Sequence, residues 1–148
     1  MDFVRDLEEF HKKFGLEYDG KPRALPEELR KFRTQFMWEE WKEYRDASTA
    51  LKIILHSKPT NVDVATMLEA QLDSLVDLVY VAIGTAYLQG FDFNEAWRRV
   101  HEKNMQKERA ERPEQSKRGT TYDVIKPEGW TPPSHRNLVE DHAHRSDQ

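Results

Sequence analysis

Two pairs of acidic residues occupy helical stretches where apolar side chains are expected. Glu40 and Glu43 are three residues apart, and Asp73 and Asp77 are four apart, so each pair shares one helix face. Burying carboxylates in groups is unfavourable, because each loses hydration and repels the others. A hard cation such as Mg²⁺ compensates, since it prefers oxygen ligands and keeps water and substrate phosphates in its shell. Two facing helices with two carboxylates each therefore predict a divalent-metal site in a helical bundle.

The ligand set of this site has alternatives. Glu69 extends the row of Asp73 and Asp77 by one turn and would substitute for either of them. No histidine falls within the two pairs, which disfavours a zinc or di-iron centre. Acidic pairs at this spacing are also common on solvated helix faces. The residues alone leave that interpretation open, although the apolar neighbours of Asp73 and Asp77 favour the metal site.

Four helical segments would position these residues. Apolar residues at helical spacing predict helices over about 2–13, 26–55, 62–89 and 94–108. The second segment carries an apolar stripe that is expected to face a core, made of Leu29, Phe32, Phe36 and Trp41. The third is apolar around most of its circumference, which is typical of the central helix of a bundle. We therefore predict an all-α fold, a helical bundle whose four-helix core is completed by oligomerisation.

The helical periodicity is lost from residue 109 onward. Prolines, glycines and charged residues dominate the rest of the chain. The expected organisation is a helical domain over 1–108, an extended C-terminal arm over 109–133 and a disordered tail over 134–148.

Composition limits the classes of function. The 148 residues are 37% hydrophobic and 34% charged, with a formal net charge of -4. Such a low apolar fraction is explained if subunits share a core. The net charge disfavours nucleic-acid binding, and the absence of cysteine removes disulfides and thiolate metal sites. The longest apolar stretch, residues 75–88, is interrupted by Asp77 and Gly84 and is too short for a bilayer, so a cytoplasmic protein is expected.

Four segments of the sequence carry recognisable motifs in a fixed order. Residues 40–43 read EWKE, 72–86 read LDSLVDLVYVAIGTA, 100–107 read VHEKNMQK and 126–133 read KPEGWTPP. Together they resemble the MazG-like superfamily of all-α nucleoside triphosphate pyrophosphohydrolases, which includes the phosphoribosyl-ATP pyrophosphohydrolases. The first two are similar to its ExxE and ExxD signature, although Ser74 stands where ExxD has Glu. The last two resemble the VHxxNMxK and KPxGWxPP elements of phage and bacterial members.

The resemblance implies a role for each motif. The ligands of Mg²⁺, or of Mn²⁺ as a substitute, would be Glu40, Glu43, Asp73 and Asp77. Either Glu40 or Glu43 would also act as the catalytic general base. The substrate contacts would come from a second set, Tyr80, Lys103, Asn104, Lys107 and Lys126. Lys103, Asn104 and Lys107 would lie one turn apart on the fourth helix, where a basic helix end that complements the helix dipole is the alternative.

The implied reaction is attack of water at the α-phosphorus, so that (d)NTP and water give (d)NMP and diphosphate. Similarity to phage members favours dGTP or GTP and a role in nucleotide-pool control, in the host cytoplasm if the chain is phage-encoded. Hydrolysis of dUTP, dCTP or phosphoribosyl-ATP is the alternative, as is a non-enzymatic helical adaptor with an acidic binding patch. The expected assembly is a homotetramer, or else a homodimer, with no nucleic-acid or membrane partner.

Overall fold

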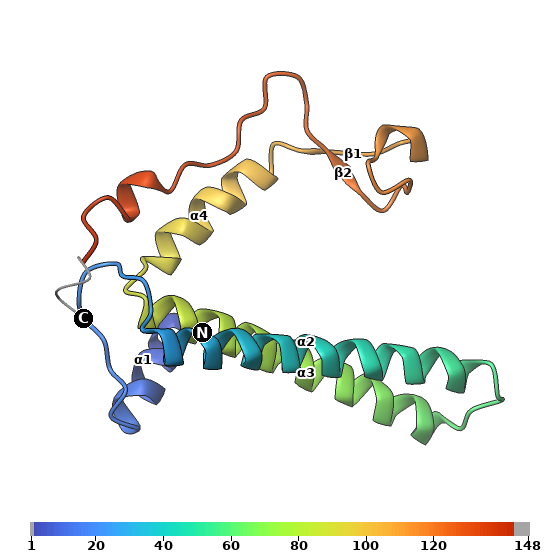
Figure 1. Cartoon of the computed structure of the whole chain (residues 1–148). Coiled ribbons are helices and arrows are strands. Elements are labelled where there is room, and N and C mark those ends of the chain that lie inside the picture. Colours follow the sequence, from blue (N-terminus) through green and yellow to red (C-terminus); the bar gives the residue numbers. More distant parts are fainter. Residues whose placement is uncertain (1, 144–148) are drawn as a thin grey trace. The chain divides into compact units, whose positions relative to one another are not determined.

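The computed structural model describes residues 2–143, which fold mainly into helices (Figure 1). The chain divides into two compact units, one formed by residues 2–91 with 142–143 and the other by Asp92–Asp141. The first unit holds α1 (Phe3–Lys13), α2 (Glu27–Leu55) and α3 (Asn61–Leu88). The second holds α4 (Phe93–Asn104), strands β1 (Glu108–Arg109) and β2 (Val124–Ile125), and the 3₁₀ turns η1 (Pro113–Gln115) and η2 (Arg136–Leu138). Two short strands are the only sheet among residues 2–143, so the predicted all-α fold is confirmed.

Local sequence signals set both ends of α1 and the start of α3. At the start of α1, the carboxylate of Asp2 accepts a hydrogen bond from the backbone N–H of Arg5. Gly15, in the left-handed region with φ of 67°, follows the end of that helix. α3 begins with a capping box, in which Thr60 and Asp63 each accept a hydrogen bond from the other's backbone N–H. The capping box therefore fixes the start of the helix that carries Asp73 and Asp77.

α2 and α3 lie side by side along most of their length (Figure 1). α2 is one continuous helix of 29 residues. It carries Glu40 and Glu43 in its middle, and α3 carries Asp73 and Asp77 in its middle. The two pairs therefore reside on neighbouring helices, as the sequence predicts.

The buried core of the first unit gathers around the C-terminal half of α3. Val81, Ile83 and Leu88 on this half are each at most 5% exposed, and Leu7 of α1 is 2% exposed. α3 packs against both α1 and α2, which confirms its predicted central position. Burial of these side chains is the main source of stability of the unit, because apolar area removed from water contributes about 25 cal/mol per Å².

The stripe predicted on α2 is not the buried face of this helix. Phe32 and Trp41 are 58% and 47% exposed, whereas Arg33 and Glu40 are buried. The prediction is therefore wrong for Phe32 and Trp41 in the single chain, whereas Leu29 and Phe36 of the same stripe are half-buried. Periodicity identifies an apolar face but not the element that covers it.

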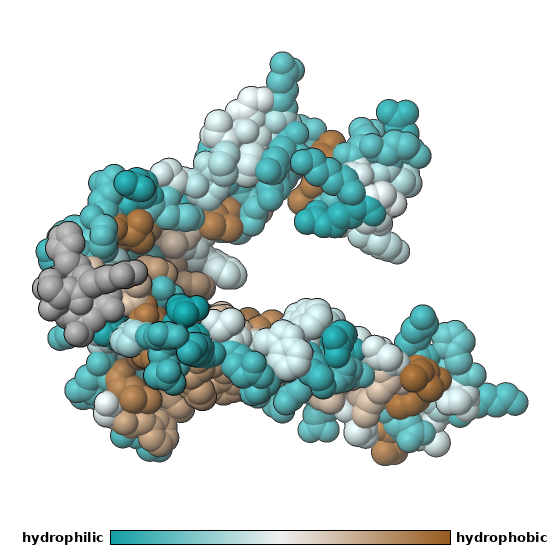
Figure 2. Space-filling view, in the orientation of Figure 1, coloured by the Kyte–Doolittle hydropathy of each residue, from teal (hydrophilic) through white to brown (hydrophobic). Residues whose placement is uncertain are grey.

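An apolar row remains uncovered on the N-terminal half of α3. Leu68, Leu72 and Val76, spaced four residues apart, are each more than half exposed. Figure 2 shows hydrophobic surface along the α2–α3 hairpin, including its far end, where Ile53, Leu55 and Val62 are also exposed. Contiguous apolar surface of this kind marks an interaction site in a folded protein.

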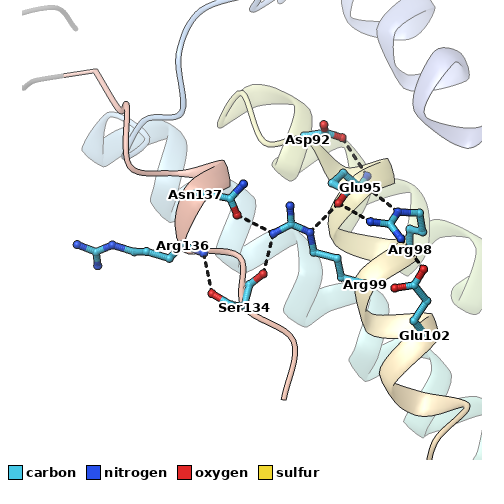
Figure 3. Close-up of polar contacts among 8 residues, drawn as sticks. All are labelled: Asp92, Glu95, Arg98, Arg99, Glu102, Ser134, Arg136 and Asn137. Atoms are coloured by element: carbon cyan, nitrogen blue, oxygen red, sulfur yellow. Dashed lines mark hydrogen bonds and ion pairs between the residues drawn. The ribbon is translucent and has the colours of Figure 1, made fainter. Parts of the chain in front are cut away.

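In the second unit, α4 is tied to the segment that follows the arm (Figure 3). The guanidinium of Arg99 donates hydrogen bonds to Glu95 on its own helix and to Ser134 and Asn137, at 2.7 Å each. Glu95 also accepts hydrogen bonds from Arg98, and these contacts lower the pKa of Glu95 to about 2. Of the tail expected over 134–148, residues 134–143 carry η2 and these bonds, and 144–148 lie outside the described residues.

None of the helices formed by residues 2–143 combines the length and the apolar character that a membrane crossing requires.

Candidate functional site

The acidic residues of α2 and α3 act electrostatically on one buried carboxylate. Glu40 is 8% exposed, and its pKa is raised, first by burial and then by the negative charges of Glu43, Asp77, Glu39 and Asp73. Glu43, Asp73 and Asp77 are themselves exposed. The four predicted ligands therefore form one acidic cluster with a buried member rather than four independent surface charges.

The chemistry of this cluster fits a divalent cation, since every donor is a carboxylate oxygen and the neighbouring carboxylates repel the charge of Glu40. As placed, however, no three histidine, aspartate or glutamate side chains in residues 2–143 converge closely enough to hold an ion.

A pocket of about 240 Å³ opens beside this cluster, between α1, α2 and α3. Its lining residues are Leu7, Phe10, His11, Arg33, Phe36, Glu40, Asp77, Tyr80 and Val81. Two predicted metal ligands and the predicted substrate residue Tyr80 therefore meet in one cavity. Tyr80 is half-buried, and its ring meets the ring of Phe10 edge to face at 5.4 Å between centroids.

Two polar residues of this pocket, Arg33 and His11, were absent from the predicted site. Arg33 is 7% exposed and donates hydrogen bonds from Nε to Thr85 Oγ1 at 3.0 Å and from Nη2 to the carbonyl of Val81 at 2.7 Å. His11 is 1% exposed and contacts the carbonyl of Leu7 through Nδ1 at 2.7 Å. The available signal was the position of Arg33, two turns before Glu40 on the same face of α2.

Burial and charge fix the protonation of His11. Burial lowers the pKa of His11 below its ordinary value, the carbonyl of Leu7 opposes this effect, and the positive charge of Arg33 adds to it. A neutral imidazole whose Nδ1 meets a carbonyl must carry its hydrogen on Nδ1, which leaves the lone pair of Nε2 as an acceptor. The pocket therefore holds one buried cation and one neutral imidazole.

The predicted lysines gather around Trp130 in the second unit. The ammonium groups of Lys107 and Lys126 lie 5.3 Å and 4.7 Å from the centroid of the Trp130 ring. Trp130 Nε1 donates to the carbonyl of Lys103 at 2.9 Å, and Lys103 Nζ is 3.3 Å from Thr131 Oγ1. Three lysines therefore lie around Trp130, and their positive charge would favour an anion nearby.

The prediction that Lys107 belongs to the fourth helix is wrong. α4 ends at Asn104, three residues before Lys107, and the carbonyl of Lys103 in its last turn accepts a hydrogen bond from Trp130 Nε1. Asn104, the last helical residue, is exposed. Lys107 and Lys103 are therefore linked by their contacts with Trp130, and not by a shared helix face.

Comparison with known families agrees with this architecture. Residues 7–104 match the phosphoribosyl-ATP pyrophosphohydrolase family, and the chain belongs to that family. This family is part of the all-α, MazG-like nucleoside triphosphate pyrophosphohydrolase superfamily. The match covers well over half of the chain and includes both acidic pairs. No curated protein matches the chain. The general activity class is therefore nucleotide pyrophosphohydrolase.

Proposed function

We propose that the chain is a Mg²⁺-dependent nucleoside triphosphate pyrophosphohydrolase that converts (d)NTP and water into (d)NMP and diphosphate. The observation that carries this proposal is the burial of Glu40 among four other carboxylates, in the wall of a pocket shared with Asp77 and Tyr80. A buried carboxylate surrounded by other negative charges is unfavourable unless a ligand offsets the charge.

Each predicted residue has a part in this proposal. Glu40, Glu43, Asp73 and Asp77 hold the ion, with Mn²⁺ as a substitute. When bound, the ion neutralises phosphate oxygens and lowers the pKa of the attacking water. Glu40 or Glu43 accepts a proton from that water, and the raised pKa of Glu40 suits it to hold one.

The phosphate chain of the substrate needs positive charge as well as the ion. Lys103, Lys107 and Lys126, gathered around Trp130, supply it, and Asn104 adds an amide donor. Tyr80 offers its ring and hydroxyl inside the pocket. The proposed substrate is dGTP or GTP. Its hydrolysis would control the nucleotide pool of the cytoplasm, which is the host cytoplasm if the protein is phage-encoded.

A product analysis tests this proposal directly. The full chain is incubated with each dNTP and NTP, with and without Mg²⁺, and products are separated. We expect nucleoside monophosphate and inorganic diphosphate in equal amounts, formed only when Mg²⁺ is present. Orthophosphate as the primary product would contradict attack at the α-phosphorus, and turnover that ignores Mg²⁺ would remove the metal from the mechanism.

Phosphoribosyl-ATP is a second candidate substrate, favoured by the family that the chain matches. It belongs in the same panel, because its hydrolysis also releases diphosphate from a nucleotide. A value of kcat/KM for phosphoribosyl-ATP above that for every dNTP and NTP would replace the proposed substrate while keeping the proposed chemistry.

Self-association follows from the apolar row of Leu68, Leu72 and Val76. We propose that this row packs against a second copy, giving a homodimer and, by pairing of dimers, a homotetramer. Leu72→Lys should lower the molar mass measured by light scattering, because it places a charge in the middle of the row. Tyr122→Lys, a change at a residue 92% exposed in the second unit, serves as the control and should leave the mass unchanged.

A further inference from the structure

Arg33 is a buried cation without a carboxylate partner. It is 7% exposed, and the atoms that accept its hydrogen bonds, Thr85 Oγ1 and the carbonyl of Val81, are neutral. Among residues 2–143 it makes no ion pair, and no carboxylate is among the causes that shift its pKa, which burial lowers. A guanidinium offers five N–H donors, and the two bonds to Thr85 and Val81 use two of them.

The lining of the pocket around Arg33 suits a flat ring. Phe36 lies below the guanidinium, with 5.7 Å between Arg33 Cζ and the ring centroid, and Phe10 and Tyr80 add two more aromatic walls. At about 240 Å³ the cavity is smaller than the sites that take whole drug-sized ligands, so it suits one ring system. Glu40 and Asp77, proposed to hold the ion that binds phosphate, lie in its wall.

Arg33 and His11, which both line the pocket, present opposite hydrogen-bonding character. Arg33 can only donate. Neutral His11, with its Nδ1 hydrogen on the carbonyl of Leu7, can only accept at Nε2. A donor beside an acceptor complements a carbonyl next to a ring N–H, which is the lactam edge of guanine, hypoxanthine, uracil and thymine. Adenine and cytosine present the reverse pattern, an amino donor beside a ring acceptor.

Resting on the proposed function, we propose that this pocket takes the nucleobase and that Arg33, with His11, selects bases that carry a lactam edge. Arg33 donates to the base carbonyl, and His11 accepts from the adjacent N–H. An amino base would leave the guanidinium unpaired and bring two donors together, which a buried site penalises strongly. Arg33 is thus a specificity-determining residue of the site.

Matched substrates isolate the lactam edge. Inosine and adenosine triphosphates differ at the C6 substituent and the adjacent N1 hydrogen, and uridine and cytidine triphosphates differ in the same way at C4 and N3. With Mg²⁺, kcat/KM for diphosphate release is measured on both pairs for the wild-type chain, Arg33→Gln and Arg33→Lys. Arg30→Gln, at an exposed arginine one turn earlier on α2, is the matched control.

The expected wild-type preference for the lactam partner is at least about 10-fold in each pair, since a hydrogen bond to a charged group contributes roughly 1.5–3 kcal/mol. Arg33→Gln should reduce this ratio toward unity, Arg33→Lys should retain part of it, and Arg30→Gln should leave it unchanged. A uniform loss on all four substrates with an unchanged ratio would show that Arg33 only supports the fold, and would overturn the proposal.

The wild-type ratios test the proposal even if Arg33→Gln does not fold. Equal rates on inosine and adenosine triphosphates, with diphosphate released from both, would defeat base selection while leaving the proposed function standing. Absence of diphosphate release from every nucleotide would defeat the proposed function instead. In that case, equal binding of inosine and adenosine monophosphates by calorimetry would overturn base selection as well, and tighter binding of inosine monophosphate would support it.

Discussion

Arg33 reaches from α2 across Gly84 of α3, so that a Cβ built on residue 84 would stand 3.0 Å from Nη2 of Arg33. The same Cβ would meet His11 Cε1 at 3.1 Å and Leu7 Cδ1 at 3.2 Å. The glycine therefore lets three helices approach closely at the floor of the pocket. Glycine is needed at position 84 because the three side chains approach so closely, and not because of an unusual backbone angle.

Gly84→Ala should destabilise the chain despite the better helix propensity of alanine. Overpacking in a close-packed core costs about 1–3 kcal/mol, and the propensity gain offsets about 1 kcal/mol of it. Urea denaturation followed by circular dichroism should show a lower midpoint. A higher midpoint would mean that the side chains of Arg33, His11 and Leu7 move aside for the added methyl group without loss of stability.

Asp77→Asn should abolish most turnover while the fold is kept. Loss of one proposed metal ligand should lower kcat/KM at least about 100-fold, since even groups that only orient metal ligands are worth 10–100-fold. In the metal-free chain the melting temperature should stay equal or rise, because one repulsive charge on Glu40 is gone. Asp46→Asn, at an exposed acid paired with Lys42, is the control and should keep its activity. Full turnover by Asp77→Asn would show that Asp77 is not needed to hold the ion and would contradict the proposed ligand set.

The stability of the metal-free chain should fall with rising pH in a way that depends on Glu40. Burial and neighbouring carboxylates raise the pKa of Glu40 above 4.5, so the folded state binds its proton more tightly than the unfolded state. The stability from this group is full below pH 4.5 and is lost as pH rises through the raised pKa. The gain from Glu40→Gln, measured by urea unfolding without Mg²⁺, should therefore increase with pH across this window. A gain that stays constant with pH would contradict the raised pKa.

The contribution of Glu95 to stability should depend on pH in the opposite direction to that of Glu40. Hydrogen bonds from Arg98 and then Arg99 lower its pKa from 4.5 to about 2, so its contribution to stability is present above pH 4.5 and is lost as pH falls toward 2. A carbon-detected NMR titration should place the midpoint of the Glu95 carboxyl near 2. Arg98→Met should move that midpoint toward 4.5. A wild-type midpoint already near 4.5 would show that the contacts in Figure 3 do not persist in solution.

Much of the helical framework could be predicted from local signals. The capping motif of Thr60 and Asp63 predicts the start of α3, and the three-residue spacing of Glu40 and Glu43 places two carboxylates on one helix face. Such signals act within one or two turns of the chain, which is the range over which periodicity and capping are informative.

The remaining features depend on contacts between residues far apart in the sequence. The early end of α4 coincides with a bond from Trp130 to the carbonyl of Lys103, 27 residues away. The burial of Arg33 depends on Thr85 and Val81 across the pocket, 52 and 48 residues away. A charged residue within an apolar stripe looks like a solvated position until the acceptors that satisfy it are known.

α3 is one unbroken helix with two different surroundings. Its C-terminal half is enclosed by α1 and α2, whereas Leu68, Leu72 and Val76 face outward, and Asp73 and Asp77 stand at the junction of the two halves. We expect the outer half to open locally more readily than the inner half, because fewer of its apolar side chains are buried. If the outward row packs against a second copy, as proposed, the order of the acidic cluster and its affinity for the proposed ion should increase with protein concentration.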